Sequence, residues 1–432
     1  MTDLLAARSQ MAVSLGFHIV FAALGIAMPV MIALAEWRWL SRKDEHGLSL
    51  AKRWSKGTAI LFAVGAVSGT VLSFELGLLW PAFMERAGPS IGPLFALEGF
   101  AFFTEAIFLG IYLYGWSRIP PKVHFVAGII VALSGVASAV FVITANAWMN
   151  HPTGFVLEDG RLTHVQPLAA FLHPIAWHEI LHMLLAAFAA TGFLVAGIHA
   201  FWLLRDPGSR FHRLALAIAL AVGGLPALLQ LLSGDLIARA VAEHQPAKLA
   251  AMEALFVTAA GADFQIGGLP DAATQTVRYA LVIPNGLSLL LHHDARAEVV
   301  GLDRVPRSDW PPVAVVHVAF QLMVACGFLM ALLALWSGWR WWKSRRLEQD
   351  RRLLLALVVA APLGFIAIEA GWIVTEVGRQ PWIIDHVMRT SEAVTSMPGL
   401  WIPMATFTLL YLVLAGVVLW ALWRHIAATE NV

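Results

Sequence analysis

The sequence predicts an all-α membrane protein with about nine transmembrane helices. Hydrophobic residues make up 59% of the 432 residues and charged residues only 13%, and the mean hydropathy is +0.73. A soluble chain of this length would expose more charge. The apolar residues gather in runs of about 20, the length that an α-helix needs to cross a bilayer. We therefore expect residues 1–432 to form a single membrane domain.

Nine runs reach the spanning length. The first continues from Asp3 and Arg8 to about Leu34, so it is not a cleavable signal peptide. In chain order the expected spans are 11–35, 57–82, 93–116, 122–147, 179–204, 212–233, 312–338, 353–375 and 399–423.

The basic residues fix the expected orientation. Lysine and arginine gather in the links after the first, third, fifth and seventh spans, and the links after the second and fourth spans hold one arginine each. Cytoplasmic links are the ones enriched in basic residues. The N-terminus is therefore predicted outside and the C-terminus in the cytoplasm. The longest link, residues 234–310, is then an extracytoplasmic loop between the sixth and seventh helices.

Composition excludes several classes of function. The net charge of +1 gives no indication of nucleic-acid binding. The single cysteine, Cys326, excludes an internal disulfide, a thiolate zinc site, an iron–sulfur cluster and a covalently attached c-type haem. Any metal centre must use histidine, methionine or carboxylate side chains.

The segment His178-Glu179-x-x-His182 opens the fifth span and allows two interpretations. It has the H-E-x-x-H pattern of zinc metalloproteases, in which two imidazoles bind zinc and a glutamate activates water. It is also a membrane helix with an inward-facing histidine that could ligate a haem. The motif alone does not choose between an intramembrane protease and a haem protein.

Polar residues within the other spans favour the haem interpretation. His18 lies about two turns below the expected outer face, and Met323 about three turns below it. Glu98 and Glu105 lie in the outer half of the third span, seven residues apart and so on one helix face. Glu376 ends the eighth span, three residues before Arg379, with which it can pair. Such groups are costly in a membrane, and here they share one layer.

The rival interpretations leave this layer unexplained. A zinc protease needs a third ligand, and Asp235 and Asp385 lie at span ends or in loops. A transporter that uses the carboxylates as ion sites would be expected to show inverted repeats with broken helices near the midplane, and no such repeat is found.

Longer strings resemble subunit I of the cytochrome bd-type quinol oxidases, over nearly the whole chain. The most specific are Gly234-Asp235…Gln245-Pro-Ala-Lys248-Leu-Ala-Ala-Met-Glu253 and Gly371-Trp372…Glu376-Val-Gly-Arg379-Gln-Pro-Trp382, with Gly16-Phe-His18 and Glu98-Gly…Glu105 in support. The resemblance implies a haem-containing subunit that oxidises quinol at the outer face, reduces O2 to water, and generates a proton gradient by charge separation without pumping.

The resemblance also assigns residues to cofactors. His182 and Met323 match the ligands of a low-spin haem b. His18 and Glu376 match the axial ligands of the two high-spin haems, with His18 assigned to haem d and Glu376 to the second haem b, an order that the sequence leaves open. Two haems b and one haem d are implied, or three haems of type b. Glu98, Glu105, Trp372 and Arg379 belong to the catalytic set.

Substrate, proton path and partners follow from the same resemblance. The quinol, ubiquinol or menaquinol, is assigned to Asp235, Gln245, Lys248 and Glu253, and the proton path to Lys56 and Glu105. Subunit II of the oxidase, a small single-span subunit and the lipid bilayer are the implied partners, in a prokaryotic cytoplasmic (inner) membrane.

Two departures from the family pattern matter. Gln321 stands where many members have arginine, which should shift the potential of the low-spin haem. The outer loop is a short form, and this leaves the identity of the quinol and the sensitivity to cyanide open.

Overall fold

The computed structural model describes residues 2–158 and 160–427. Within these residues nine helical segments are long and apolar enough to cross a membrane, which confirms the predicted number. They are α1 (Asp3–Arg42), α2 (Glu45–Leu79), α3 (Pro81–Gly115), α4 (Pro121–Asn150), α6 (Pro174–Arg205), α7 (Arg210–His244), α10 (Val313–Ser344), α11 with α12 (Arg351–Ala360 and Leu363–Val377), and α14 (Trp401–Ala427).

The helices differ from the expected spans mainly at their ends. Helix α1 exceeds the expected 11–35 at both ends, and α7 continues through Gly234 as far as His244. Helices commonly continue past the apolar run, because the run measures only the hydrocarbon core. The eighth span is broken between α11 and α12 at Pro362, since proline has no N–H to donate and its ring clashes with the preceding turn.

Helix α6 lies at the centre of the bundle, where small residues allow close packing. It contacts α1, α4, α7, α11 and α12. A Cβ added at Gly192 would lie 2.4 Å from Cα of Gly223 on α7, and one added at Gly364 would lie 2.3 Å from Cα of Ala190 on α6. Glycine and alanine at such crossings let helix backbones approach closely, which is how membrane helices gain packing energy.

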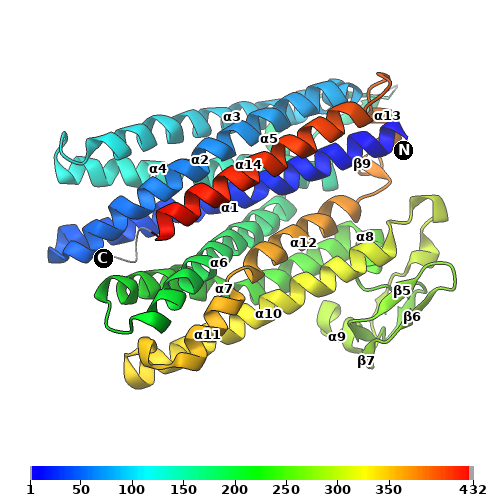
Figure 1. The fold of residues 1–432 in the computed structure, drawn as a ribbon. Coiled ribbons are helices and arrows are strands. Elements are labelled where there is room, and N and C mark those ends of the chain that lie inside the picture. The colour runs from blue at the N-terminus through cyan, green and yellow to red at the C-terminus, as the bar shows by residue number, and fades with distance from the viewer. Residues whose placement is uncertain (1, 159, 428–432) are drawn as a thin grey trace.

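The segment between α7 and α10 forms a lobe of short elements at one end of the bundle. Figure 1 places this lobe at the same end as the N-terminus, with the C-terminus at the other end. Its strands form three antiparallel ribbons, β3–β8, β4–β7 and β5–β6. Its elements are α8 (Pro246–Met252), β3 (Ala259–Ala260), β4 (Phe264–Ile266), β5 (Leu269–Asp271), β6 (Thr276–Arg278), β7 (Leu281–Ile283), α9 (Gly286–His292), β8 (Glu298–Val299), η1 (Leu302–Arg304) and η2 (Arg307–Asp309).

Two residues of α10 hold the lobe against the bundle. The ring nitrogens of His317 lie 2.8 Å from the carbonyl oxygen of Met252 and 3.0 Å from that of Gly267. The amide of Gln321 accepts from the N–H of Gly267 at 2.9 Å and donates to the carbonyl of Gln265 at 3.0 Å. Gln321 therefore has a structural use of its own at this position.

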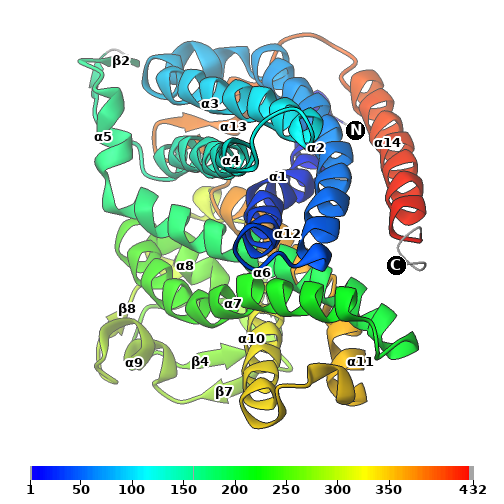
Figure 2. The same cartoon turned by 90° about the vertical axis from the view of Figure 1, so that its left-hand side faces the viewer.

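The remaining short elements lie in other links. They are β1 (Val156–Glu158), β2 (Arg161–Thr163), α5 (Pro167–Leu172), η3 (Leu347–Gln349), β9 (Trp382–Ile384), β10 (Met388–Arg389) and α13 (Thr390–Ala393). Figure 2 shows α14 at the edge of the bundle, next to α2. The apolar stretches of α2, α3 and α14 are only 17%, 17% and 11% buried, so these helices face lipid or another chain.

Candidate functional site

A hydrogen-bonded network surrounds Glu376 at the end of α12. The Nδ2 of Asn146, on α4, donates to Oε1 of Glu376 at 2.6 Å. The Nη2 of Arg379 donates to Oε2 at 2.5 Å, so the pair predicted from the three-residue spacing is present. The Arg379 side chain is only 3% exposed, and its Nε and Nη1 have no partner among the described residues.

Lys248 extends this network to α8. Its ammonium donates to Oδ1 of Asn150 at 2.5 Å, and Asn150 donates to the carbonyl and side-chain oxygens of Asn146. Glu179 lies within electrostatic range of Lys248, Arg379 and Glu376. Burial lowers the pKa of Lys248 to about 8, an effect that nearby Glu179 partly offsets. Side chains from α4, α6, α8 and α12 therefore share one charged cluster.

His182 on α6 is oriented by a serine of α7. The Ser233 hydroxyl lies 3.1 Å from the carbonyl oxygen of Gln230 and 3.0 Å from Nδ1 of His182. A carbonyl can only accept, so the hydroxyl proton goes to it and Nδ1–H of His182 donates to the serine. The lone pair is then on Nε2, which faces the amide nitrogen of Gln230 at 3.0 Å.

His18 on α1 repeats this arrangement with α2. The Ser68 hydroxyl lies 2.9 Å from the carbonyl of Val64 and 2.9 Å from Nδ1 of His18. A glycine follows the serine in both cases, and a Cβ added at Gly69 would lie 3.0 Å from Cε1 of His18. Histidines that ligate metals usually donate their second ring nitrogen in this way, which fixes the ring and leaves the other nitrogen free.

Met323 on α10 lies against a glycine of α12. A Cβ added at Gly371 would be 3.1 Å from the Met323 sulfur. The next residue, Trp372, is partly buried and its indole N–H has no partner among the described residues. The Met323 thioether therefore occupies space that a side chain at position 371 would fill.

Four further carboxylates lie on the membrane-spanning helices α2, α3 and α12. The predicted pair is present on α3: the hydroxyl of Ser138 donates to Glu98 at 3.0 Å, and Glu105 is 7% exposed. Sequence reasoning gave no role to the other two. Glu75 on α2 is buried and accepts from Gln10 and Ser14, both at 2.8 Å. Glu369 on α12 has its Oε2 beside Gly16, two residues before His18, and its Oε1 has no partner among the described residues.

The residues predicted to bind quinol separate into two groups. Asp235 pairs with Arg239 at 2.7 Å, and Lys248 belongs to the Glu376 network. Gln245 and Glu253, at the two ends of α8, are buried, and the whole Gln245 amide and Oε2 of Glu253 lack partners within the described chain. Burial raises the pKa of Glu253 to about 8.

Lys56 lies on α2. Together with Lys52 and Trp116 it lines a cavity of about 250 Å³. Lys56 is exposed. A cavity at this place is compatible with the predicted proton path.

The zinc-protease interpretation finds no support. No cluster of three histidine, cysteine or carboxylate side chains that could hold a metal occurs in residues 2–158 and 160–427. Glu179, the residue that would activate water in a protease, lies instead within electrostatic range of Lys248 and Arg379.

Comparison with known proteins shows the family of this chain. A family model described as "Cytochrome bd terminal oxidase subunit I" matches residues 6–430. The chain belongs to the cytochrome bd terminal oxidase subunit I family. A solved structure, "The structure of bd oxidase from Geobacillus thermodenitrificans", is 38% identical, covers 99% of this chain and 98% of its own, and superposes with a TM-score of 0.92.

Two relatives from Bacillus subtilis (strain 168) carry quinol oxidase names. "Putative cytochrome bd menaquinol oxidase subunit I" is 39% identical over 98% of this chain and 96% of the relative. "Cytochrome bd ubiquinol oxidase subunit 1" is 32% identical over 99% of this chain and 94% of the relative. This cytochrome bd subunit is therefore part of a quinol oxidoreductase, and it is a multi-pass protein of the bacterial inner membrane.

Membership in a cytochrome family implies haem cofactors, and the side chains of this structure fit haem. The two serine-anchored imidazoles, the thioether of Met323 and the carboxylate of Glu376 are all known types of iron ligand or close analogues of them. The buried, unpartnered Nε and Nη1 of Arg379 need an anionic acceptor. A haem propionate would be an acceptor of this kind.

Proposed function

We propose that this chain is the haem-carrying subunit of an oxidase that takes electrons from quinol at the end of the bundle with the lobe and reduces O2 to water. The main support is the matched anchoring of His18 and His182, each held through Nδ1 by a serine of the neighbouring helix. In both rings this anchoring leaves the lone pair on Nε2, which is the arrangement that a metal-ligating histidine needs.

His182 and Met323 would hold a low-spin haem b, and His18 and Glu376 the two high-spin haems. These groups would be two haems b and one haem d, or three haems b, and when bound they supply electron transfer and O2 chemistry. The protein contributes ring orientation through Ser68 and Ser233. It also contributes positive charge through Arg379, which the carboxylate of Glu376 partly neutralises.

Quinol oxidation would use the groups at the two ends of α8. Each quinol releases two electrons and two protons, so two quinols supply the four electrons that convert O2 and four protons into two waters. Glu253 would accept a quinol proton, and Gln245 would bond a ring oxygen with its unpartnered amide. The choice between ubiquinol and menaquinol is a further part of this proposal, and the 39% identical menaquinol-named relative supports menaquinol.

Protons for water would come from the opposite end of the bundle. Lys56 at its cavity and Glu105 within α3 would carry them toward Glu98 and the high-spin haems. With the N-terminus outside, quinol protons leave on the outer side while substrate protons are taken from the cytoplasm. Each charge moved in this way stores about 2.3 kcal/mol per 100 mV of membrane potential, without a pump.

The exposed faces of α2, α3 and α14 would be covered partly by lipid and partly by further chains of the complex. Subunit II and a small single-span subunit are the proposed partners. A scarcely buried helix such as α14, 11% buried in its apolar stretch, gains packing from such a neighbour.

The proposal is tested by counting haems in the purified complex. His182→Ala and Met323→Leu should each remove the low-spin haem b signal from the reduced-minus-oxidised spectrum, and His18→Ala and Glu376→Ala should each remove a high-spin signal. His199→Ala is a matched control, because His199 is buried in the same helix as His182 but pairs through Nδ1 with His212 at 2.8 Å. A full haem count in His18→Ala and His182→Ala would contradict the proposal.

A further inference from the structure

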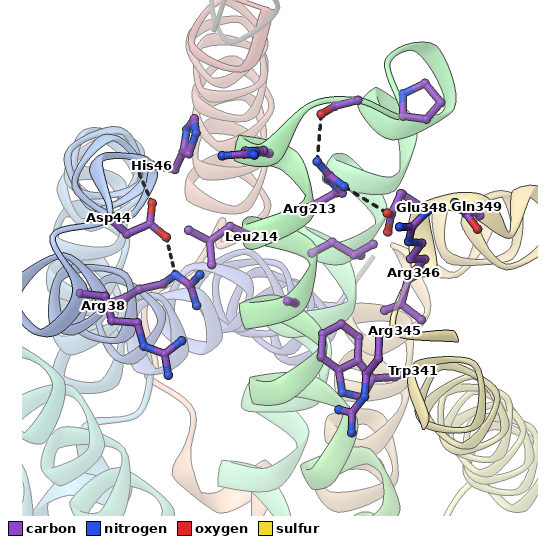
Figure 3. A pocket seen from close by; sticks show the side chains of 17 residues that line it. Arg38, Asp44, His46, Arg213, Leu214, Trp341, Arg345, Arg346, Glu348 and Gln349 are labelled. Carbon is purple, nitrogen blue, oxygen red and sulfur yellow. Dashed lines mark hydrogen bonds and ion pairs between the residues drawn. The ribbon is translucent and has the colours of Figure 1, made fainter. Parts of the chain in front are cut away.

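A basic pocket lies at the opposite end of the bundle from the lobe, outside the oxidase site. Its volume is about 980 Å³, and it lies between the link from α1 to α2, the start of α7, and the end of α10 with η3. Figure 3 shows Arg38 and Asp44 on one wall and Arg213 with Glu348 on the other. The charged or titratable residues in its lining are Arg38, Arg42, Asp44, His46, Arg210, Arg213, Arg345, Arg346 and Glu348.

The charge of this pocket is not balanced by its own carboxylates. Six arginines and two carboxylates line it, which leaves four positive charges with His46 neutral. Asp44 pairs with Arg38 at 2.6 Å, and Glu348 pairs with Arg213 at 3.2 Å. The other four arginines, Arg42, Arg210, Arg345 and Arg346, form no ion pair with a carboxylate of the described chain.

Positive charge at this end is expected from topology alone, but its gathering in one cavity is not. The positive-inside rule asks only that basic residues follow alternate spans. Here the end of α1, the start of α7 and the link after α10 each contribute arginines to the same cavity, although Arg42 and Arg345 are far apart in sequence. Arginine forks match phosphate oxygens in geometry as well as in charge.

The lining changes from basic to apolar toward the membrane. On α7, Arg210 and Arg213 come first, and Leu214 and Ala217 follow on the same face one to two turns deeper. On α10, Trp341 precedes Arg345 by one turn and is 43% exposed. Exposed tryptophan at a helix end marks the membrane interface, so the arginines lie at the level of lipid headgroups.

We propose that this pocket binds the headgroup of an anionic phospholipid with two phosphodiesters, and that the apolar side of the lining receives the start of its acyl chains. Four unpaired arginines allow two for each phosphodiester. Basic pockets between transmembrane helices on the cytoplasmic side are a known means of holding such headgroups. A free phosphate compound would satisfy the arginines but would leave the apolar side chains of Leu214 and Ala217 without a partner.

The test is native mass spectrometry of the delipidated complex titrated with diphosphatidylglycerol in detergent. Phosphatidylcholine and inorganic diphosphate are the comparison ligands. Wild type should bind one diphosphatidylglycerol more tightly than either. The variant Arg42→Gln/Arg345→Gln/Arg346→Gln should bind it about 100-fold more weakly, since each basic residue near an anionic lipid contributes roughly fivefold in affinity.

The matched control is Arg118→Gln/Arg351→Gln/Arg352→Gln, which removes the same charge from the same end of the bundle without touching the pocket lining. It should bind within about twofold of wild type. Replacing the three pocket arginines by lysine should preserve most of the binding, and this variant keeps the test valid if the glutamine variant does not fold. Equal weakening in both glutamine variants, or diphosphate binding as tightly as the lipid, would overturn the proposal.

Discussion

Glu253 offers the most direct quantitative test of the proposed quinol chemistry. It follows the last residue of α8, is 5% exposed, and its Oε2 has no partner within the described chain. Burial disfavours the ionised carboxylate and raises its pKa to about 8. A carboxylate must be ionised to take a proton from quinol, so the fraction of Glu253 that can act as a base increases as the pH rises toward 8.

The expected size of the effect follows from this pKa. At pH 6 about 1% of Glu253 is ionised, at pH 7 about 9%, and at pH 8 about 50%. If proton transfer to Glu253 limits quinol oxidation, kcat/KM should rise about 50-fold between pH 6 and pH 8. Glu253→Gln keeps the shape of the side chain and removes the base, so it should lower kcat/KM at pH 8 by about 100-fold or more.

The assay is O2 consumption by the purified complex with a soluble quinol from pH 6 to pH 8, corrected for quinol autoxidation. Glu243→Gln serves as the control, because Glu243 is an exposed glutamate near the end of α7, and it should keep the wild-type profile. The reasoning fails if wild-type kcat/KM is flat over this range, or if Glu253→Gln retains the same rise with pH.

Three further predictions concern positions that hold the site and the bundle together. Ser233→Ala removes the hydrogen-bond acceptor of the His182 imidazole, the proposed haem ligand, so haem retention during dilution should weaken by about 10- to 100-fold. Unchanged retention would show that the serine does not orient the ring. Gly371→Ala places a methyl group 3.1 Å from the sulfur of Met323, so the low-spin band in the reduced spectrum should decrease, and an intact band would refute this steric argument. Gly364→Ala places a methyl group 2.3 Å from the backbone of α6, so the complex should lose about 1–3 kcal/mol of stability. The thermal midpoint of this variant should be lower than that of the control Gly327→Ala, where an added Cβ would have nothing within 4 Å.

The H-E-x-x-H motif shows why local sequence was not enough. His178, Glu179 and His182 have the spacing of a zinc site, and that spacing is a property of the helix alone. The neighbours that decide their use lie on other segments of the chain. Ser233 engages His182, and Lys248 with Arg379 lies near Glu179. None of these three is within 50 residues of the motif in sequence, so no local pattern could have placed them there.

The sequence by itself determined the class of protein and the number of membrane crossings. Runs of apolar residues report burial in lipid directly, because an uncompensated charge or open backbone in a bilayer is too costly to occur by chance. The long sequence strings around Glu253 and Glu376 indicated the family. The pair of Glu376 and Arg379 was also predictable, since one helical turn joins them.

Only the tertiary structure decided how the histidines are held and where the arginines converge. The Ser-Gly dipeptides that orient His18 and His182 also occur at Ser134 and Ser337, so the sequence does not mark the two that matter. The basic pocket combines three links that are distant along the chain. Contacts of this kind depend on the rotation and crossing of packed helices, which small residues such as Gly192 and Gly364 permit and which the periodicity of one helix cannot specify.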